Sequence, residues 1–430
     1  MGVSMLNKAA KVCLTLITLM YLTACGSSTL ESEHVLVKSH DDLAHLYGVT
    51  SIQGDVSIMV DTVTSLRQLS ELTQIDGDLV ISHTASLISL EGLDNLVSVS
   101  GRVTIAMNES LEDLSGLENL QEVGELWVNG NPVLTSLEGL NGLQTIQGDA
   151  VIWPNESLES LEGLSQLQTV VRDFKVCNNA SLTSLSALRS LNSIGNSLII
   201  VDNALLADLG EIGRVQTLPG ELNINQNPSL EHLDGLEGLE VVLGDIHIYS
   251  LDSLTNTNGL KNLIAVNQSL ILWRNPMLSN IDGLSKLETV GASLEISENA
   301  LLENFVGLKN LGSIGDSLVI TKNSGLQFFG GFTKLGYIGS QLNIELNPAL
   351  LNINELENVK TVDGGISIRY NDELLSISGL AGLEAIAGDL TIKGNNNLPE
   401  CSIEVILKEI GDNVRGVTQV ENNNGQIICE

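Results

Sequence analysis

The chain has 430 residues and a formal net charge of −33, with 43% hydrophobic but only 3% aromatic residues. Nucleic acid is excluded as a partner class, because a chain this acidic repels phosphates instead of releasing counterions from them. The apolar content excludes a wholly disordered chain, since disordered acidic chains are poor in apolar residues. Length alone favours several domains, unless a short internal repeat distributes the apolar residues.

The N-terminus has the pattern of an export signal. Two lysines precede an apolar run over residues 12–22, which is shorter than the roughly 17–25 residues that span a membrane. The run ends in Leu22 to Cys25, with the sequence LTAC, which resembles a bacterial lipobox. The resemblance implies cleavage before Cys25, lipid on its sulfur, and a membrane partner at the bacterial envelope, in the outer membrane or at the cell surface. An ordinary signal peptide with an incidental cysteine is the alternative.

The body of the chain is one short repeat. Its landmark is a triplet with apolar first and third residues, which predicts a short strand. The first residues of these triplets are 56, 79, 103, 126, 150, 174, 198, 222, 246, 270, 294, 318, 342, 366 and 390. Twelve of the fourteen spacings are 24 residues and two are 23, so one register holds throughout.

Other positions of the repeat are also restricted, counting the first apolar residue of each triplet as position 0. Apolar residues recur at positions 8, 11, 14, 17 and 20, and position 13 is glycine in ten repeats. Position 5 is aspartate, threonine or leucine at Asp61, Thr84 and Leu251 and asparagine in the other twelve repeats. These asparagines are Asn108, Asn131, Asn155, Asn179, Asn203, Asn227, Asn275, Asn299, Asn323, Asn347, Asn371 and Asn395.

Such a repeat predicts a solenoid, mainly β, of about 15 rungs of 24 residues with one parallel sheet face. A unit of this size cannot bury its apolar side chains alone, so neighbouring rungs must stack, at about 4.8 Å per strand. We expect the asparagines to point inward as a ladder and to pair with backbone groups that would otherwise be unpaired in the core. Glycine at position 13 fits either a tight turn with positive φ or close packing of rungs.

The pattern L-x-I-x-x-N-x-x-L-x-x-L-x-G-L-x-x-L-x-x-V resembles a leucine-rich repeat and is most similar to the receptor L-domain variety. The resemblance covers about residues 34–430 and extends to bacterial surface lipoproteins. The pattern is specific for the fold and weak for function. A receptor kinase role is not implied, because no kinase or cysteine-rich module accompanies the repeats.

Both ends of the solenoid are expected to be capped. His34 to Val37 predict an edge strand, and residues 39–47 a capped short helix. A helix over Ser402 to Ile410, ended by Gly411, is expected to cover the open edge of the last rung. The chain thus divides into a signal peptide (1–24), a lipidated tether (25–33), an N-terminal cap (34–53), the solenoid (54–397) and a C-terminal cap (398–430).

Export makes the cysteines candidates for a disulfide. Cys401 and Cys429 flank the C-terminal cap and are the natural pair. Cys177 is left over, as a free thiol. No cysteine–histidine spacing of a metal site occurs, and no metal or cofactor is expected.

Exposed aromatic residues are the candidate ligand-binding site, because positions −1, 1 and 3 face outward from the sheet. Trp127, Trp153 and Trp273 all occupy such positions. His247, Tyr249, Trp273 and Arg274 are expected to form one patch, and Trp127 with Trp153 a second pair. Aromatic platforms with polar rims suit sugar rings or a protein partner. Packing between neighbouring rungs of the ladder is the alternative explanation.

Two sets of charged residues, one basic and one acidic, are explained better by local structure than by a ligand or a metal ion. Lys322, Arg369 and Lys393 gather near the C-terminal end of the sheet face, where local charge balance explains them better than a docking role. The acids that precede strands lie on single rungs or on pairs of adjacent rungs spread along the chain, so turn chemistry explains them better than calcium. These acids are Asp55, Asp78, Asp149, Asp173, Asp245 and Asp389.

The predicted function is non-catalytic. No histidine belongs to an HExxH, GxSxG or metal-ligand context. We expect a monomeric surface lipoprotein that binds a protein or glycan ligand through its sheet face. A structural envelope scaffold without a specific ligand is one alternative. A polysaccharide-processing enzyme with its site around Arg274 is another.

Overall fold

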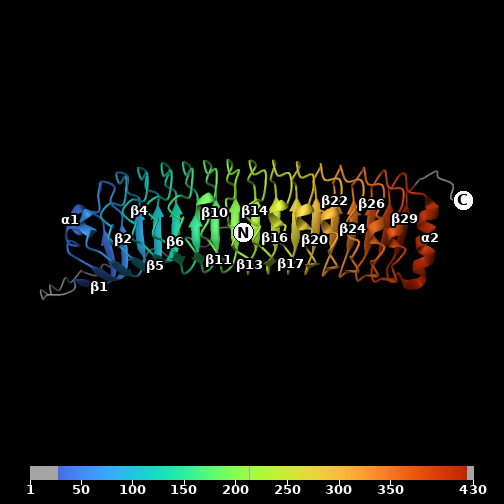
Figure 1. The fold of residues 1–430 in the computed structure, drawn as a ribbon, viewed down its shortest axis with the longest axis horizontal. Helices are drawn as coiled ribbons and strands as arrows, with labels where there is room; N and C mark the ends of the chain where they lie inside the picture. Colours follow the sequence, from blue (N-terminus) through green and yellow to red (C-terminus); the bar gives the residue numbers. More distant parts are fainter. Residues whose placement is uncertain (1–27, 213, 424–430) are drawn as a thin grey trace.

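The fifteen predicted triplets all lie in β-strands, which stack in parallel along an elongated rod in the computed structural model (Figure 1). The structure describes residues 28–212 and 214–423. The signal region, Cys25 and Cys429 lie outside the described residues. The main row of strands comprises β1 (Thr29–Val37), β2 (Ser51–Ile58), β4 (Leu79–Ser82), β5 (Ser98–Ala106), β6 (Glu122–Asn129), β8 (Ala150–Ile152), β10 (Phe174–Cys177), β12 (Leu198–Val201), β14 (Leu222–Asn225), β16 (Ile246–Tyr249), β18 (Leu270–Trp273), β20 (Leu294–Ser297), β22 (Leu318–Thr321), β24 (Leu342–Glu345), β26 (Ile366–Arg369), β28 (Leu390–Lys393) and β29 (Thr418–Glu421).

The register joins equal positions of consecutive rungs. Leu198 pairs with Leu222 and Ile200 with Ile224, and the same alignment recurs along the rod. The first and last strands add one rung at each end. The predicted edge strand at His34 to Val37 is confirmed, but it begins earlier, at Thr29. β29 pairs in register with β28, so the solenoid continues into the predicted C-terminal cap.

A second, shorter row of parallel strands lies one corner away from the main row, where a single sheet face was expected. Except for β3, its strands occupy positions 19 and 20 of the repeat, where the apolar residue at position 20 is buried. β5 and β6 run through both rows, with an irregularity at the corner between Val99 and Arg102. The second row comprises β3 (Gln74–Asp76), β7 (Thr145–Ile146), β9 (Thr169–Val170), β11 (Ser193–Ile194), β13 (Thr217–Leu218), β15 (Val241–Val242), β17 (Ala265–Val266), β19 (Thr289–Val290), β21 (Ser313–Ile314), β23 (Tyr337–Ile338), β25 (Thr361–Val362) and β27 (Ala385–Ile386).

The rest of each turn is irregular chain or a single 3-10 turn. Glycine at position 13 makes room for the neighbouring rung: a Cβ on Gly163 or Gly283 would collide with a backbone carbonyl of the rung before. Close packing is therefore the reason for this glycine, and positive φ accompanies it at Gly163 but not at Gly283. The 3-10 turns are η1 (Arg67–Leu69), η2 (Ser186–Leu188), η3 (Asn258–Leu260), η4 (Asp282–Leu284), η5 (Val306–Leu308), η6 (Asn354–Leu356), η7 (Ser378–Leu380) and η8 (Gly411–Asn413).

The core is one continuous column of aliphatic side chains from the stacked rungs. Leu134, Leu137 and Leu140 show the typical rung, in which positions 8, 11 and 14 have no exposed surface. The aromatic residues of the core are phenylalanines: Phe174, Phe305, Phe329 and Phe332 are fully buried. Three of them, Phe305, Phe329 and Phe332, contact one another with ring centroids 5.3–5.5 Å apart.

The predicted asparagine ladder is confirmed, and all twelve asparagines are fully buried. In a typical rung, the backbone N–H and the side-chain Nδ2 of Asn131 both donate to Oδ1 of Asn155 at 3.1 Å. Asn155 Nδ2 in turn donates to the carbonyl of Val128, one rung back, at 3.0 Å. Each amide therefore satisfies a backbone N–H and a backbone carbonyl of the preceding rung, in a place that water does not reach.

The ladder differs from the prediction at its end and is interrupted once. Asn423 adds a thirteenth asparagine: it accepts from the backbone N–H of Asn395 at 3.0 Å. Asn423 follows Asn395 by 28 residues instead of the usual 24, because a helix is inserted between β28 and β29. Leu251 breaks the chain of amides in the middle, because its side chain has no oxygen to accept from Asn227.

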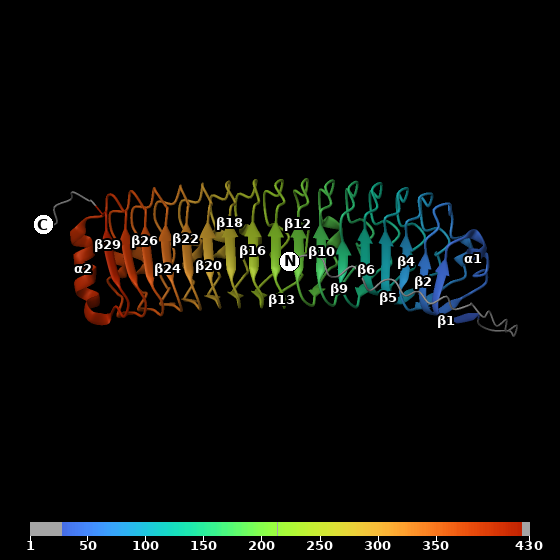
Figure 2. The ribbon, with the colours of Figure 1, turned by 180° about the vertical axis from the view of Figure 1, so that it is seen from behind.

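Helices cap both ends of the rod (Figures 1 and 2). The side chain of Ser39 accepts from the backbone N–H of Asp42 and starts α1 (His40–Ala44), as predicted. α2 (Glu400–Ile410) ends at Gly411 and buries Ile403, Ile406 and Ile410 against the last rung. As predicted, this helix covers the end of the core at the last rung, but the edge of strand β28 is covered by β29, whose four residues are exposed.

The cysteines agree with the predicted assignment as far as the structure describes them. Cys401 is disulfide-bonded, and its predicted partner Cys429 lies outside the described residues. Cys177 is a half-buried free thiol, as predicted. Within residues 28–212 and 214–423, no helix is long and apolar enough to cross a membrane.

Replacing one ladder residue tests the role of the amides. We expect Asn155→Leu to lower the free energy of unfolding by about 3 kcal/mol, because two buried donors of Asn131 lose their acceptor. Urea denaturation followed by circular dichroism measures the change. Asn141→Leu is the matched control, since Asn141 is exposed. Equal stability of the two variants would contradict a structural role for the ladder.

Candidate functional site

The outward side chains at positions 1 and 3 of the main strands form a long surface, here called the sheet face. From the rung of residue 56 to the rung of residue 318 they number 24, and only Lys175 and Glu295 carry a formal charge. The chain as a whole carries −33. Over these twelve rungs the sheet face is therefore almost uncharged, although acids border it at position −1, and it costs little to desolvate for a neutral partner.

Tyr249 and Trp273 form the aromatic pair that the sequence predicts. They occupy position 3 of the paired strands β16 and β18, with ring centroids 5.7 Å apart and an interplanar angle of 38°. Tyr249 is half-buried, and Trp273 keeps 37% of its surface exposed. The pair is partly used for packing between rungs, yet it leaves aromatic surface open to solvent.

Charged residues surround one edge of Trp273. Glu298 accepts hydrogen bonds from Lys322 Nζ at 2.9 Å and from the side chain of Trp273. The Lys322 hydrogen bond is the main cause of a lowered pKa of Glu298, and the charge of Arg274 adds to it. Arg274, Glu298 and Lys322 all sit at position 4 with φ of 55–58°, a left-handed turn that directs the next residue into the ladder.

His247 lies on the same strand as Tyr249, but its charged partner is elsewhere. Its Nδ1 is 3.9 Å from Oε2 of Glu221, on the preceding rung. Glu295 is in register with Ile271 and therefore lies beside Trp273 on the face. The predicted patch of His247, Tyr249, Trp273 and Arg274 is thus one neighbourhood, in which only the two aromatic rings contact each other directly.

Trp127 and Trp153 do not form the expected second pair, and no contact between their rings occurs in the described part of the chain. The guanidinium of Arg102 covers the Trp127 ring at 4.3 Å from its centroid. Trp153 is 48% exposed. Its indole N–H donates to the side-chain oxygen of Asn178 at 3.0 Å, with that amide oriented to satisfy both of its neighbours. Trp127 is therefore a packing residue, while Trp153 offers an open ring.

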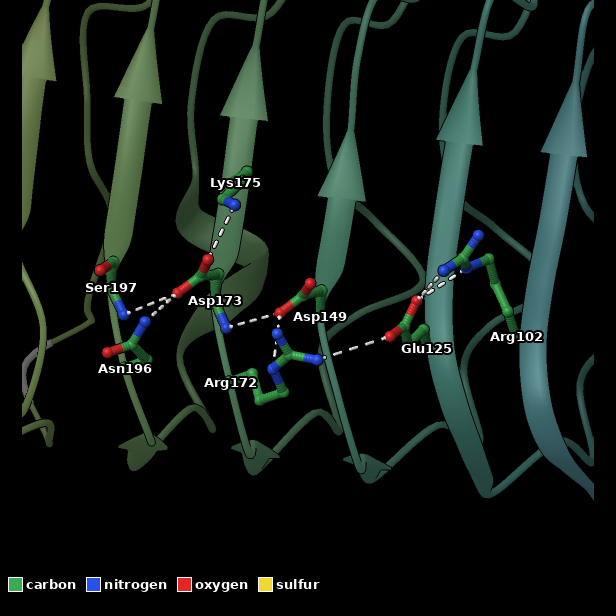
Figure 3. Close-up of polar contacts among 8 residues, drawn as sticks. All are labelled: Arg102, Glu125, Asp149, Arg172, Asp173, Lys175, Asn196 and Ser197. Carbon is green, nitrogen blue, oxygen red and sulfur yellow. Dashed lines mark hydrogen bonds and ion pairs between the residues drawn. The ribbon is translucent and has the colours of Figure 1, made fainter. Parts of the chain in front are cut away.

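An ionic network links the corners of neighbouring rungs beside Trp127 (Figure 3). Arg102 contacts Glu125 at 2.6 Å, and Arg172 lies 3.8 Å from Glu125 and 3.5 Å from Asp149. Asp149 also accepts from the backbone N–H of Asp173 at 3.2 Å. The carboxylates at position −1 thus bind the next rung, as turn chemistry predicts. In the described residues, no three His, Cys, Asp or Glu side chains are arranged to hold a metal ion.

Asp173 is the clearest example of this role. Burial opposes its ionisation, but hydrogen bonds from Lys175, Asn196 and the backbone of Ser197 outweigh burial and lower the pKa of Asp173. Lys175 Nζ lies 2.7 Å from its carboxylate. The charged form of Asp173 is therefore part of the folded structure.

The basic residues near the C-terminal end are paired with acids on neighbouring rungs. Lys322 contacts Glu298 at 2.9 Å, and Lys393 contacts Glu421 at 3.0 Å. Arg369 lies 3.8 Å from Glu345. Local charge balance, the predicted explanation, is confirmed.

Two residues of the face were not predicted from the sequence to belong to the candidate binding surface. Cys177 lies at position 3, in register with Val201, and burial raises the pKa of its thiol, which makes it a weak nucleophile at neutral pH. Asn225 is only 2% exposed, although it occupies an outward position. Its Oδ1 has no hydrogen-bond partner among the described residues. No sequence signal distinguishes this asparagine, because its burial depends on the neighbouring side chains.

No protein-family model and no curated protein matches this chain. Three solved structures of leucine-rich-repeat proteins are similar to it. A TLR13–ssRNA13 complex has 14% identity over 93% of this chain and 74% of that chain, with a TM-score of 0.30. The Leptospira interrogans LRR protein LIC12759 has 15% identity over 87% and 97%, with a TM-score of 0.30. The mouse RP105/MD-1 complex has 14% identity over 90% and 89%, with a TM-score of 0.19.

The fold itself is a leucine-rich-repeat-like solenoid. This follows from its own 24-residue period, its columns of buried leucines and its asparagine ladder, the features that the sequence predicts. These features define an architecture with a long presenting surface, and the residues on that surface decide its use.

Lys175→Met tests the electrostatic role of Asp173. We expect the pKa of Asp173 to rise toward 3.8, its ordinary value, and the fold to lose stability near neutral pH. A carboxyl with a lowered folded-state pKa stabilises the fold above its unfolded-state value, and this contribution disappears as the pH falls through the folded value. The difference from the wild type should therefore vanish at acidic pH.

Urea denaturation at pH 7 and near pH 3, with an NMR titration of the Asp173 carboxyl, measures these effects. Lys309→Met, at an exposed lysine, is the control. An unchanged titration of Asp173 in Lys175→Met would contradict the assigned contact.

Proposed function

We propose that this chain is a non-catalytic binding scaffold that is exported, anchored to the bacterial envelope by lipid on Cys25, and engages a protein or glycan ligand through its sheet face. The observation that carries the proposal is the Tyr249–Trp273 pair, open to solvent on an almost uncharged face. Exposed aromatic rings surrounded by polar groups are typical anchors of binding sites.

Packing within the ladder accounts for some aromatic residues and not for others. Four of the five phenylalanines are buried, only Phe328 is partly exposed, at 39%, and Arg102 covers Trp127. Trp153 and Trp273 instead leave 48% and 37% of their surfaces in water. Large exposed rings cost solubility unless they are used, so this contrast favours a binding role for these two residues.

The surroundings of Arg274 favour binding over catalysis. The pKa of the nearby Glu298 is lowered by its hydrogen bond from Lys322, so this carboxyl is charged at neutral pH. A general acid for polysaccharide cleavage needs a raised pKa instead. His247 faces Glu221 on the preceding rung. The charged groups here are suited to fixing the edge of Trp273 and to forming hydrogen bonds with a ligand.

The double variant Tyr249→Ala with Trp273→Ala tests binding through the sheet face. The wild-type protein and the double variant are each applied to an array of glycans and surface proteins. We expect the amount of double variant retained by the ligand of the wild type to be at least about tenfold lower. The melting curve should stay close to that of the wild type. Trp127→Ala is the control, because its ring is covered by Arg102.

Equal retention by the wild type and the double variant would contradict the assigned face. If deletion of the protein damaged the envelope while no saturable ligand existed, a purely structural scaffold would replace the proposal.

Cys25→Ser tests the anchor. Without the sulfur that carries the lipid, we expect the protein to leave the membrane fraction and appear in the soluble fraction of cells. Fractionation followed by immunoblotting measures the distribution, with Cys177→Ser as the control cysteine variant. Membrane retention of Cys25→Ser at the wild-type level would refute lipid anchoring through this residue.

A further inference from the structure

We propose that the sheet face binds a linear, uncharged oligosaccharide that lies along the rod axis and stacks on Trp153 at one end and on Trp273 at the other. This inference rests on the proposed function and names the chemical class of its ligand. It depends on the residues at position 3 of six consecutive rungs, here called the outer column. These are Trp153, Cys177, Val201, Asn225, Tyr249 and Trp273.

The outer column is continuous because the strand register aligns it. Cys177 pairs with Val201, Val201 with Asn225, and Tyr249 with Trp273. Trp153 directly follows β8, which pairs with β10. Five strand steps of about 4.8 Å separate the end rungs, so the two tryptophans lie about 24 Å apart along the rod. Such a spacing suits an extended polymer that contacts both rings at once.

Both terminal rings are held by their edges. The indole N–H of Trp153 donates to Asn178, and that of Trp273 interacts with Glu298. A ring that is fixed before the ligand arrives loses little conformational entropy on binding. Because the polar edges are occupied, the exposed surface that remains is mainly the ring itself, which matches the C–H face of a sugar.

Amide groups lie between the aromatic anchors. Asn225 donates from Nδ2 to Oδ1 of Asn223 at 2.5 Å, while its own Oδ1 has no partner among the described residues. An unpaired acceptor in a residue with 2% exposure is costly, and a ligand donor that reaches it recovers this cost. Sugar hydroxyl groups both donate and accept, so they suit a strip that contains a buried, unpaired acceptor next to aromatic rings.

The charges favour a neutral ligand. The outer column carries no formal charge, whereas acids flank it at position −1 and position 4, for example Asp173, Glu221 and Asp202. A polyanionic glycan would be repelled by these flanks and by the net charge of −33. A protein partner needs about 800 Å² on each side and an apolar centre. The centre of this strip is a thiol, a valine and an amide, which suits a narrower and more polar ligand.

Isothermal titration of the purified full chain tests the inference. The probes are linear neutral oligosaccharides of glucose and of N-acetylglucosamine, about two to eight units long, with heparin as an anionic comparison. We expect affinity to rise with chain length until both anchors are bridged, as in other linked two-site contacts. Trp153→Ala and Trp273→Ala should each weaken binding of the longest bound probe about tenfold, and the double variant should abolish it.

Matched variants separate stacking from stability. Trp153→Phe and Trp273→Phe should retain most of the affinity, because a phenyl ring can still stack. Trp127→Ala should bind like the wild type, because Arg102 already covers its ring. Melting curves of all variants identify any that fail to fold, and the phenylalanine variants then provide the test.

The outcomes distinguish this inference from the function on which it rests. Absence of binding by every neutral probe, binding that the double tryptophan variant leaves unchanged, or salt-sensitive binding of heparin alone would overturn it. If a protein from the array is retained, and that retention is lost in the variant lacking Tyr249 and Trp273, the glycan inference fails while the sheet-face function stands. If neither sugar nor protein is retained, both fail.

Discussion

The structure depends on satisfying the backbone groups that each turn buries at its inner corner. Position 5 directs a backbone N–H into an apolar interior that water does not reach, and the amide of the next rung accepts from it. The side chain of Asn155 accepts from Asn131 and donates to Val128 on the preceding rung, and its own backbone N–H donates to the amide of the next rung, so the same residue must recur at the same place. The two-sided role of this residue explains why the repeat holds its 24-residue period for most of the chain.

The periodic interior constrains the inward positions of each rung and leaves the outward positions free to vary. The outward residues therefore determine which ligand the surface can bind. Core positions repeat leucine, isoleucine and a few phenylalanines, whereas positions 1 and 3 contain tryptophan, asparagine, cysteine, lysine and glutamate. Parallel stacking places these outward residues in straight columns, because every rung keeps the same register. Residues 24 positions apart in the chain therefore become neighbours, and Tyr249 meets Trp273 without any additional folding device.

Prediction of individual site residues succeeded where register alone decided the outcome and failed where side chains reach across rungs. The Tyr249–Trp273 contact needs only equal positions on adjacent strands. Trp127 and Trp153 both occupy outward positions. The ring of Trp153 is open to solvent, whereas that of Trp127 is covered by the long side chain of Arg102. The burial of Asn225 is a similar case, since it depends on the packing of several neighbouring side chains.

The sequence by itself determined the repeat, the strand positions, the buried asparagines and the adjacency of outward residues, because each follows from a period that is counted along the chain. Only the tertiary structure showed the second row of strands, the return of β29 after α2, and the thirteenth ladder residue, Asn423. The inserted helix changes the spacing between the last two ladder asparagines to 28 residues, so the last rung cannot be found by counting repeats of 24 along the sequence. The structure likewise separated the covered tryptophan from the open ones, because coverage depends on where a neighbouring side chain lies in space.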